Sequence, residues 1–192
     1  MLFESESCNS NASTHNESEL NKVIFKNKKH FIISEEKVSN VVTSISTRLI
    51  SILMRNKEVA NYAKLVKKQS KLIFTSKKIP SISIGDYLNR LYKYTKCDAS
   101  TLIISLIYIE RLLNKTKIIL TETNIHRIVV ASVLVSIKVN EDHKTKKRFY
   151  AIIAGMDKFE LNNLEREFIY EINFDLFVVP NEYYNYKTEL NV

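Results

Sequence analysis

Glycine is scarce in this sequence, with only Gly85 and Gly155 in a chain of 192 residues. A Walker-type phosphate loop needs two glycines five positions apart, and a dinucleotide-binding fingerprint needs three, because only a residue without Cβ lets backbone N–H groups close on phosphate. The separation of 70 positions excludes both motifs. Two glycines and two prolines are also too few for the turns of a β-sandwich or barrel. The sequence therefore predicts a mostly helical protein.

Cysteines and long apolar runs are scarce as well. The two cysteines, Cys8 and Cys97, cannot form a disulfide framework or a four-ligand zinc site. This predicts a reducing setting, in the nucleus and/or cytoplasm. The longest apolar runs, residues 102–109 and 128–137, are too short to span a bilayer, and the polar, acidic N-terminus does not resemble a signal peptide. We therefore expect a soluble protein without a membrane partner.

The positive charge is concentrated in one segment. The net charge of +8 divides into −4 for residues 1–20, +11 for residues 21–78 and +1 for the rest. Most of the basic residues are lysines, whereas proteins that read nucleic acid favour arginine with interleaved aromatics. The pattern favours a solvated helical face over a nucleic-acid footprint, so we do not expect nucleic acid as the main partner.

Apolar spacing divides the chain into four parts. The first 35 residues are polar, with too little apolar surface to offset the entropy of ordering, and predict a disordered arm. From Glu36, apolar residues recur at spacings of 3 and 4, which predicts an N-terminal helix followed by a basic linker. The predicted boundaries are 1–35 for the polar arm, 36–79 for the N-terminal helix and linker, 80–178 for the main domain and 179–192 for a C-terminal tail.

The main domain shows the pattern of five helices. Gly155 stands where a left-handed C-cap belongs, and Asp157 with Glu160 forms a candidate capping box. The third helix is apolar on all sides, so we expect it at the centre of the others. The predicted fold is all-α, a single five-helix domain around a buried central helix, preceded by the N-terminal helix. The five helices are predicted over residues 83–94, 99–113, 123–139, 148–154 and 157–173.

Residues with catalytic or metal-binding chemistry are scattered. The four histidines lack the i, i+4 pairing with a carboxylate that a helical zinc site needs, and no nucleophile–histidine motif is present. We therefore expect no catalytic residue, no metal and no cofactor, and the sequence does not indicate an enzyme.

Two charged residues occupy unusual positions. Glu165 falls on or beside the apolar stripe of the fifth helix, and Lys138 stands at the exit of the buried third helix. In one interpretation, Lys138 complements the helix C-terminus while Glu165 lies at the edge of the stripe with its carboxylate in solvent. In the other, the two charges face a partner.

Four segments in order resemble the cyclin box of the P/U-type cyclins, the phosphate-regulation-related branch with a single cyclin fold. The segments are PSISIGDYLNRLYKY (80–94), LIYIERLL (106–113), NIHRIVVASVLVSIKVNED (124–142), and FYAIIAG with ELNNLEREFIYEINFDL (149–155 and 160–176). The resemblance covers about half the chain, and more if STRLISILMRN of the N-terminal helix is counted.

The resemblance implies a regulatory subunit that binds and activates a cyclin-dependent kinase. By this likeness Lys138 and Glu165 bond to backbone groups of the kinase beside the helix that carries its catalytic glutamate. Val139, Ile169 and Phe174 are the implied apolar contacts. For each of these residues core packing is the alternative, and Phe174 could serve both roles.

One departure from the family pattern keeps other functions open. Residues 144–147, Lys-Thr-Lys-Lys, replace a Tyr-Tyr-x-Asn-like stretch that is common in the family. A helical scaffold that has lost kinase binding therefore remains an alternative. Another is a cyclin-like module that binds nucleic acid or transcription factors through the basic segment 21–78, because a fold alone does not determine function.

Overall fold

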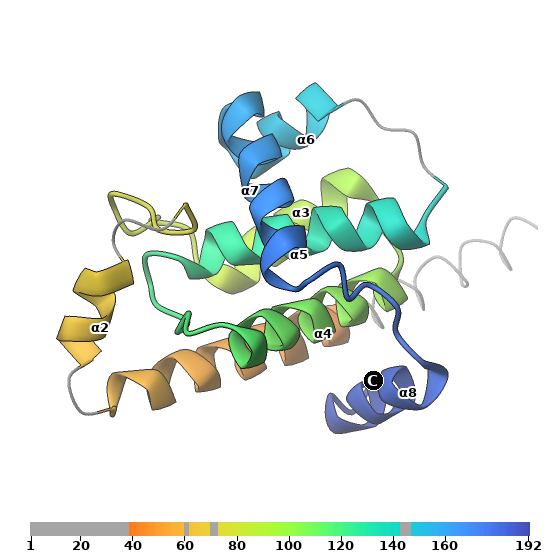
Figure 1. The fold of residues 1–192 in the computed structure, drawn as a ribbon. Coiled ribbons are helices and arrows are strands. Elements are labelled where there is room, and N and C mark those ends of the chain that lie inside the picture. The colour runs from red at the N-terminus through yellow and green to blue at the C-terminus, as the bar shows by residue number, and fades with distance from the viewer. Residues whose placement is uncertain (1–38, 60–61, 70–72, 143–146) are drawn as a thin grey trace, which may run out of the picture. The chain divides into compact units, whose positions relative to one another are not determined.

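The computed structural model describes residues 39–59, 62–69, 73–142 and 147–192. Within these ranges every regular element is a helix, as predicted (Figure 1). The predicted polar arm, residues 1–35, lies outside the described residues. The first described helix covers residues 39–57, and it is followed by α2 (Tyr62–Gln69), α3 (Ile84–Thr95), α4 (Ala99–Lys115), α5 (Ile125–Asn140), α6 (Lys147–Ala154), α7 (Lys158–Glu171) and α8 (Pro180–Glu189).

Helix α5 is the central helix of the domain. All residues from Ile128 to Ile137 are buried, and helices α3, α4 and α7 pack against α5. Its serines do not disturb this packing, because each hydroxyl has a partner; Ser136 Oγ donates to the carbonyl of Thr101 in α4 at 2.7 Å. Helix α5 has 16 residues, and none of the described helices has the length and apolar character needed to cross a membrane.

The helix over residues 39–57 lies beside α4 (Figure 1). Val42, Ile45 and Leu49 follow one another at spacings of 3 and 4, and all three are buried. Its polar face also contacts the domain, because Arg48 Nε donates to Glu110 Oε1 of α4 at 3.0 Å. This helix is therefore part of the domain.

The ends of α6 and α7 follow the sequence signals in part. Gly155 ends α6 with a φ of +71°, in the left-handed region that favours glycine. The Asp157 carboxylate caps α7 by accepting a bond from the Phe159 N–H at 2.7 Å. The capping box is not completed as predicted, since Glu160 pairs with Arg127 of α5 instead. A guanidinium offers a carboxylate a stronger, charge-assisted bond than a backbone amide does.

Residues 179–192, to which the sequence analysis assigned no helix, contain α8. Pro180 stands in the first turn, where its missing N–H leaves no bond unmade. Tyr186 Oη donates to Glu110 Oε2 of α4 at 2.9 Å, and Leu190 after the helix is buried. No side chain within α8 itself is fully buried, so the helix lacks the aliphatic stripe that pattern reading detects.

Removing the aromatic ring of Phe168 should strongly destabilise the domain. Phe168 is fully buried on α7, edge-on to Phe74 with ring centroids 6.4 Å apart. We expect Phe168→Ala to lower the free energy of unfolding by about 3–5 kcal/mol, since it leaves a cavity. Phe159→Ala, on the same helix but at a position 75% exposed, should change it by less than about 0.5 kcal/mol. Urea denaturation measures both variants, and equal losses of unfolding free energy would contradict the packing of α7.

Candidate functional site

Lys138 lies where the buried part of α5 ends. Ile137 is buried, whereas Lys138, Val139 and Asn140 are exposed. The helix closes after Asn140, with the N–H of Glu141 bonded to the carbonyl of Ile137 at 2.9 Å. A lysine in the last turn complements the partial negative charge of the helix C-terminus. The central helix thus holds a cation at the protein surface.

Glu165 faces Lys138 from α7. Leu161, Leu164 and Phe168 bury one side of α7, and the Glu165 side chain lies at the edge of that side with 14% of its surface exposed. Lys138 Nζ donates to Glu165 Oε1, so the structure brings together the two charges that the sequence singled out. An ion pair at a protein surface contributes at most about 1 kcal/mol to stability. The main effect of this ion pair is to hold the Lys138 ammonium and the Glu165 carboxylate next to each other at the protein surface.

The three predicted apolar contacts differ in exposure. Val139 is 47% exposed and Phe174 is 68% exposed, which does not fit the alternative that they serve core packing. Ile169 is partly buried and packs against the core, so it fulfils that alternative in part. Ile169 follows Glu165 by four residues and therefore lies on the same face of α7.

A tight turn at the end of α7 holds Phe174 at the surface. The Phe174 N–H bonds the carbonyl of Ile169 at 3.0 Å, and the Asn173 N–H bonds that of Tyr170 at 2.9 Å. These are the two bonds of a Schellman motif. Asn173 and Phe174 have φ values of 54° and 55°. Asparagine tolerates this region, whereas a bulky residue there costs about 1–3 kcal/mol and such strain concentrates at functional sites.

Arg111 of α4 holds residues 173–179, the strap that joins α7 to α8. Its Nη1 donates to the carbonyl oxygen of Asp175 at 2.7 Å and to Oδ1 of the same residue at 3.0 Å. Its Nη2 donates to the carbonyl of Phe177 at 2.9 Å and to Glu182 Oε2 at 2.7 Å. A planar guanidinium can satisfy several acceptors in fixed directions. One side chain therefore anchors both the strap and the start of α8 to α4.

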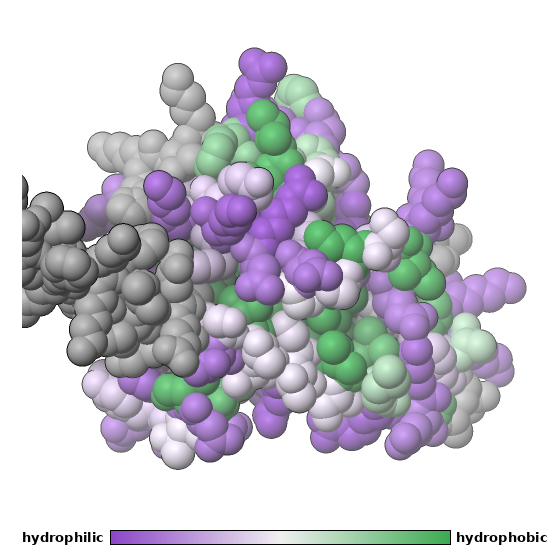
Figure 2. Space-filling model, turned by 180° about the vertical axis from the view of Figure 1, so that it is seen from behind, coloured by the Kyte–Doolittle hydropathy of each residue, from purple (hydrophilic) through white to green (hydrophobic). Residues whose placement is uncertain are grey.

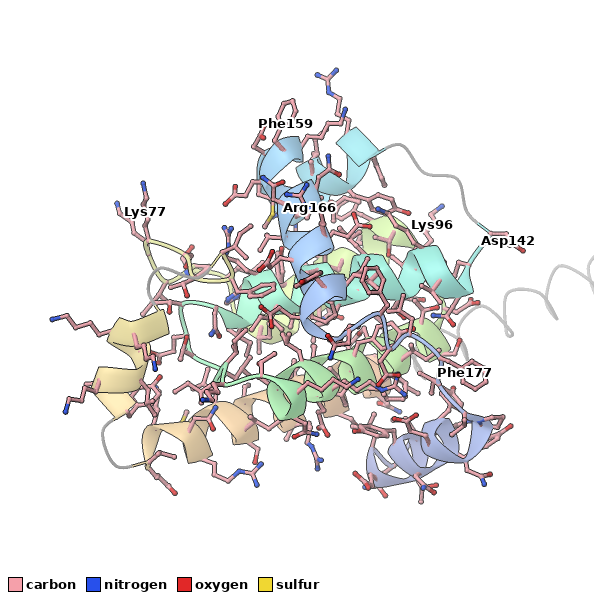
Figure 3. All side chains as sticks on the ribbon, in the orientation of Figure 1. Lys77, Lys96, Asp142, Phe159, Arg166 and Phe177 are labelled. Carbon is pink, nitrogen blue, oxygen red and sulfur yellow. The ribbon has the colours of Figure 1, made fainter. Side chains whose placement is uncertain are left out.

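Two further side chains of α4 complete this anchoring. Tyr108 Oη donates to the carbonyl of Leu176 at 2.7 Å, and Lys115 Nζ donates to Asp175 Oδ2 at 2.6 Å. Leu176 and Val178 pack against the core, while Phe177 between them is 76% exposed. Figure 3 shows Phe177 beside α8, on the side of the domain where α5 ends.

Sequence reasoning missed the roles of Tyr108 and Arg111. Both stand in the apolar segment LIYIERLL on α4. A polar side chain in a buried stretch needs a hydrogen-bond partner, and this requirement was the available signal. The partners lie 64 to 71 residues further along the chain, so only the fold identifies them.

Groups with catalytic potential are limited in the part of the chain that the structure describes. Cys97 is buried, and its burial raises the pKa of the thiol to about 11, so the thiol stays protonated near neutral pH. The described residues contain no group of three or more His, Cys, Asp or Glu side chains that could hold a metal ion.

Comparison with known proteins identifies the family. The family model for cyclins matches residues 4–176, a range that begins in the predicted polar arm and ends in the strap. The chain therefore belongs to the cyclin family, whose members are regulatory proteins.

Three similar relatives point to one branch of that family. The chain is 33% identical to Cyclin-U4-3 of Arabidopsis thaliana over 153 residues, which cover 79% of this chain and 69% of the relative. It is 32% identical to Cyclin-U3-1 of the same plant over 161 residues, 83% of this chain and 73% of the relative. It is 29% identical to Cyclin-P3-1 of Oryza sativa subsp. japonica over 163 residues, 82% of this chain and 68% of the relative. The chain is a P/U-type cyclin, as the sequence segments indicated.

Loss of the Arg111 guanidinium should loosen the strap and destabilise the domain. Arg111→Ala leaves the Glu182 carboxylate without its cation and removes one of the two cations bonded to Asp175, so we expect the free energy of unfolding to fall by about 2 kcal/mol or more. Arg166→Ala is the control, because Arg166 is exposed on α7 and bonds Asn163 at 3.1 Å (Figure 3). Denaturant titration should separate the two variants, and equal stabilities would contradict the anchoring role.

The bond between Lys115 and Asp175 should make stability depend on acid pH. The Lys115 ammonium lowers the pKa of the Asp175 carboxyl below its ordinary 3.8 in the folded protein. A lowered folded pKa means that the pair stabilises the fold above pH 3.8 and that this contribution disappears as the pH falls through the folded pKa. The stability difference between wild type and Asp175→Asn should therefore shrink when urea titrations are moved from neutral pH to well below pH 3.8. A difference in the free energy of unfolding that stays constant with pH would contradict the stabilising role of the Lys115–Asp175 pair.

Proposed function

We propose that this cyclin binds and activates a cyclin-dependent kinase through α5, α7 and the helix over residues 39–57. The observation that carries the proposal is the contact between Lys138 and Glu165, with the exposed side chain of Val139 beside it. Family membership makes such a kinase the expected class of partner.

The proposed mechanism is allosteric. A protein kinase is inactive until a glutamate on one of its helices pairs with the lysine that positions ATP. A rigid partner that presses on this helix shifts it inward and completes the kinase active site. The end of α5 suits this task, because α5 is fixed on all sides by the packing of its neighbours.

The charged pair keeps bonding capacity for a partner. An ammonium group has three N–H donors, of which the bond to Glu165 uses one, and Glu165 engages Lys138 through one of its two oxygens. The other donors and the second oxygen can bond to backbone groups of a kinase and fix its register.

Apolar contacts supply most of the binding energy in such an interface. Val139 and Phe174 provide exposed apolar surface on α5 and after α7, and Ile169 is partly exposed between them in the chain. A stable complex should bury more than about 1,000 Å² in total.

The test removes both charges together. Tagged Lys138→Ala/Glu165→Ala should lose co-purification with the kinase and the associated kinase activity, while the helical circular dichroism stays that of wild type. The matched control is Asp86→Ala/Lys93→Ala, which removes two exposed charges of opposite sign from α3, a helix outside the proposed interface. This control should retain the kinase.

Two results would overturn the proposal in different ways. Equal kinase recovery with wild type and with the Lys138/Glu165 variant would refute the site. Recovery of transcription or RNA factors without any kinase would refute the function and favour the nucleic-acid module instead.

A further inference from the structure

A groove runs between the end of α5, the strap and α8. Val139 of α5, Phe177 of the strap, and Tyr183 and Tyr184 of α8 line it, and none of its lining side chains carries a charge. The rings of Tyr183 and Tyr184 meet edge to face with centroids 5.6 Å apart. The groove is thus a mainly aromatic and aliphatic surface, with Asn140 as a polar side chain in its lining.

Two aromatic side chains that line the groove are largely exposed to solvent and are not part of the buried core. Phe177 is 76% exposed and Tyr184 is 61% exposed. Single exposed apolar residues are common on proteins, but a contiguous group marks an interaction site. Of the 14 exposed large apolar residues in the described part of the chain, six belong to the end of α5, the end of α7, the strap and α8: Val139, Tyr170, Phe174, Phe177, Val179 and Tyr184.

Three of the remaining exposed apolar residues, Tyr94, Phe149 and Ile152, line a second groove, but that groove also carries the charged side chains of Asp86, Arg90 and Lys93. The other five lie on the helix over residues 39–57 or just after it, before α3, and on α7. On the face seen from behind in Figure 2, hydrophobic side chains form several groups with hydrophilic ones between them.

The groove is held open by bonds to the backbone of its strap. Arg111 bonds the carbonyl of Phe177, and Tyr108 bonds that of Leu176. The strap therefore cannot fold Phe177 back onto the domain without breaking charge-assisted bonds. A surface fixed in its binding conformation loses little entropy when a partner docks.

The groove also begins at the proposed kinase site. Val139, which lines the groove, directly follows Lys138 of the ion pair. A kinase that bonds Lys138 and Glu165 would lie at the entrance of the groove.

We propose that this groove, lined by Val139, Phe177 and Tyr184, receives an uncharged, apolar segment of the same kinase and forms a second half of the interface. The inference rests on the proposed function and deepens it. The kinase is the favoured occupant because the groove continues the surface of the ion pair and lacks charges that would select an ionic ligand. A second copy of this chain and the Leu2–Phe3 end of its own polar arm are the competing occupants.

The test measures affinity with purified proteins. The cyclin-dependent kinase that co-purifies with wild type is produced separately and titrated calorimetrically against the full chain and its variants. Phe177→Ala/Tyr184→Ala should raise Kd about tenfold or more, as expected for aromatic residues at an interface. The matched control is Tyr94→Ala/Ile152→Ala, at sites 52% and 65% exposed on α3 and α6, outside the proposed interface, which should leave Kd within about twofold. Circular dichroism verifies that all variants fold.

The outcomes separate this inference from the proposed function. If the Lys138/Glu165 variant loses the kinase but the Phe177/Tyr184 variant binds like wild type, the groove inference is wrong and the proposed function stands. If no cyclin-dependent kinase co-purifies, both are wrong. If the Lys138/Glu165 variant and the Phe177/Tyr184 variant both bind like wild type, the proposed site and the groove inference are wrong, and kinase binding itself stands. If the Phe177/Tyr184 variant binds normally and instead turns a dimer into a monomer in sedimentation, a second copy is the occupant. If deleting the arm increases kinase affinity in wild type but not in this variant, the arm is the occupant.

Discussion

The burial of α5 is the constraint on which the rest of the structure depends. Its residues from Ile128 to Ile137 are removed from water on every side, so helices must surround it. Helices α3, α4 and α7 pack against α5. Because the helix is fixed by apolar contacts along its length, the residues that follow the buried run emerge at a defined place. Lys138 and Val139 are those residues.

A different kind of interaction positions the irregular part of the molecule. The strap cannot use helical hydrogen bonds, and its backbone groups need partners. Side chains of α4 supply partners for three carbonyls of the strap, with Arg111 bonding those of Asp175 and Phe177 and Tyr108 bonding that of Leu176. Burial of apolar side chains therefore positions the helices, and hydrogen bonds from α4 side chains position the strap that joins α7 to α8. Together they present an ion pair and several apolar side chains on rigid supports.

The sequence predicted the features that depend on local or periodic patterns. The apolar run of α5 indicated a central helix, and Gly155 marked the end of α6. Features that depend on distant partners were not predictable in this way. Glu160 pairs with Arg127 across the fold instead of capping its own helix, and α8 is held by Tyr186 and by residues at its ends rather than by an aliphatic stripe.

In the candidate site, too, local patterns were predictable from the sequence and contacts between distant residues were not. Lys138 and Glu165 stood out in the sequence because each interrupts or ends an apolar pattern, but their contact across 27 residues required the packing of α7 on α5. The groove could not be predicted, because it combines residues of α5, the strap and α8 that share no sequence pattern.

Hydrogen–deuterium exchange of the full chain, alone and with its kinase, tests the central claim most directly. The account predicts that kinase binding slows exchange in the helix over residues 39–57, at the end of α5, in the second half of α7 and in the strap, and leaves α2 (Tyr62–Gln69) unchanged. Slower exchange in α2 and the basic segment around it, with α5, α7 and the strap unchanged, would contradict it.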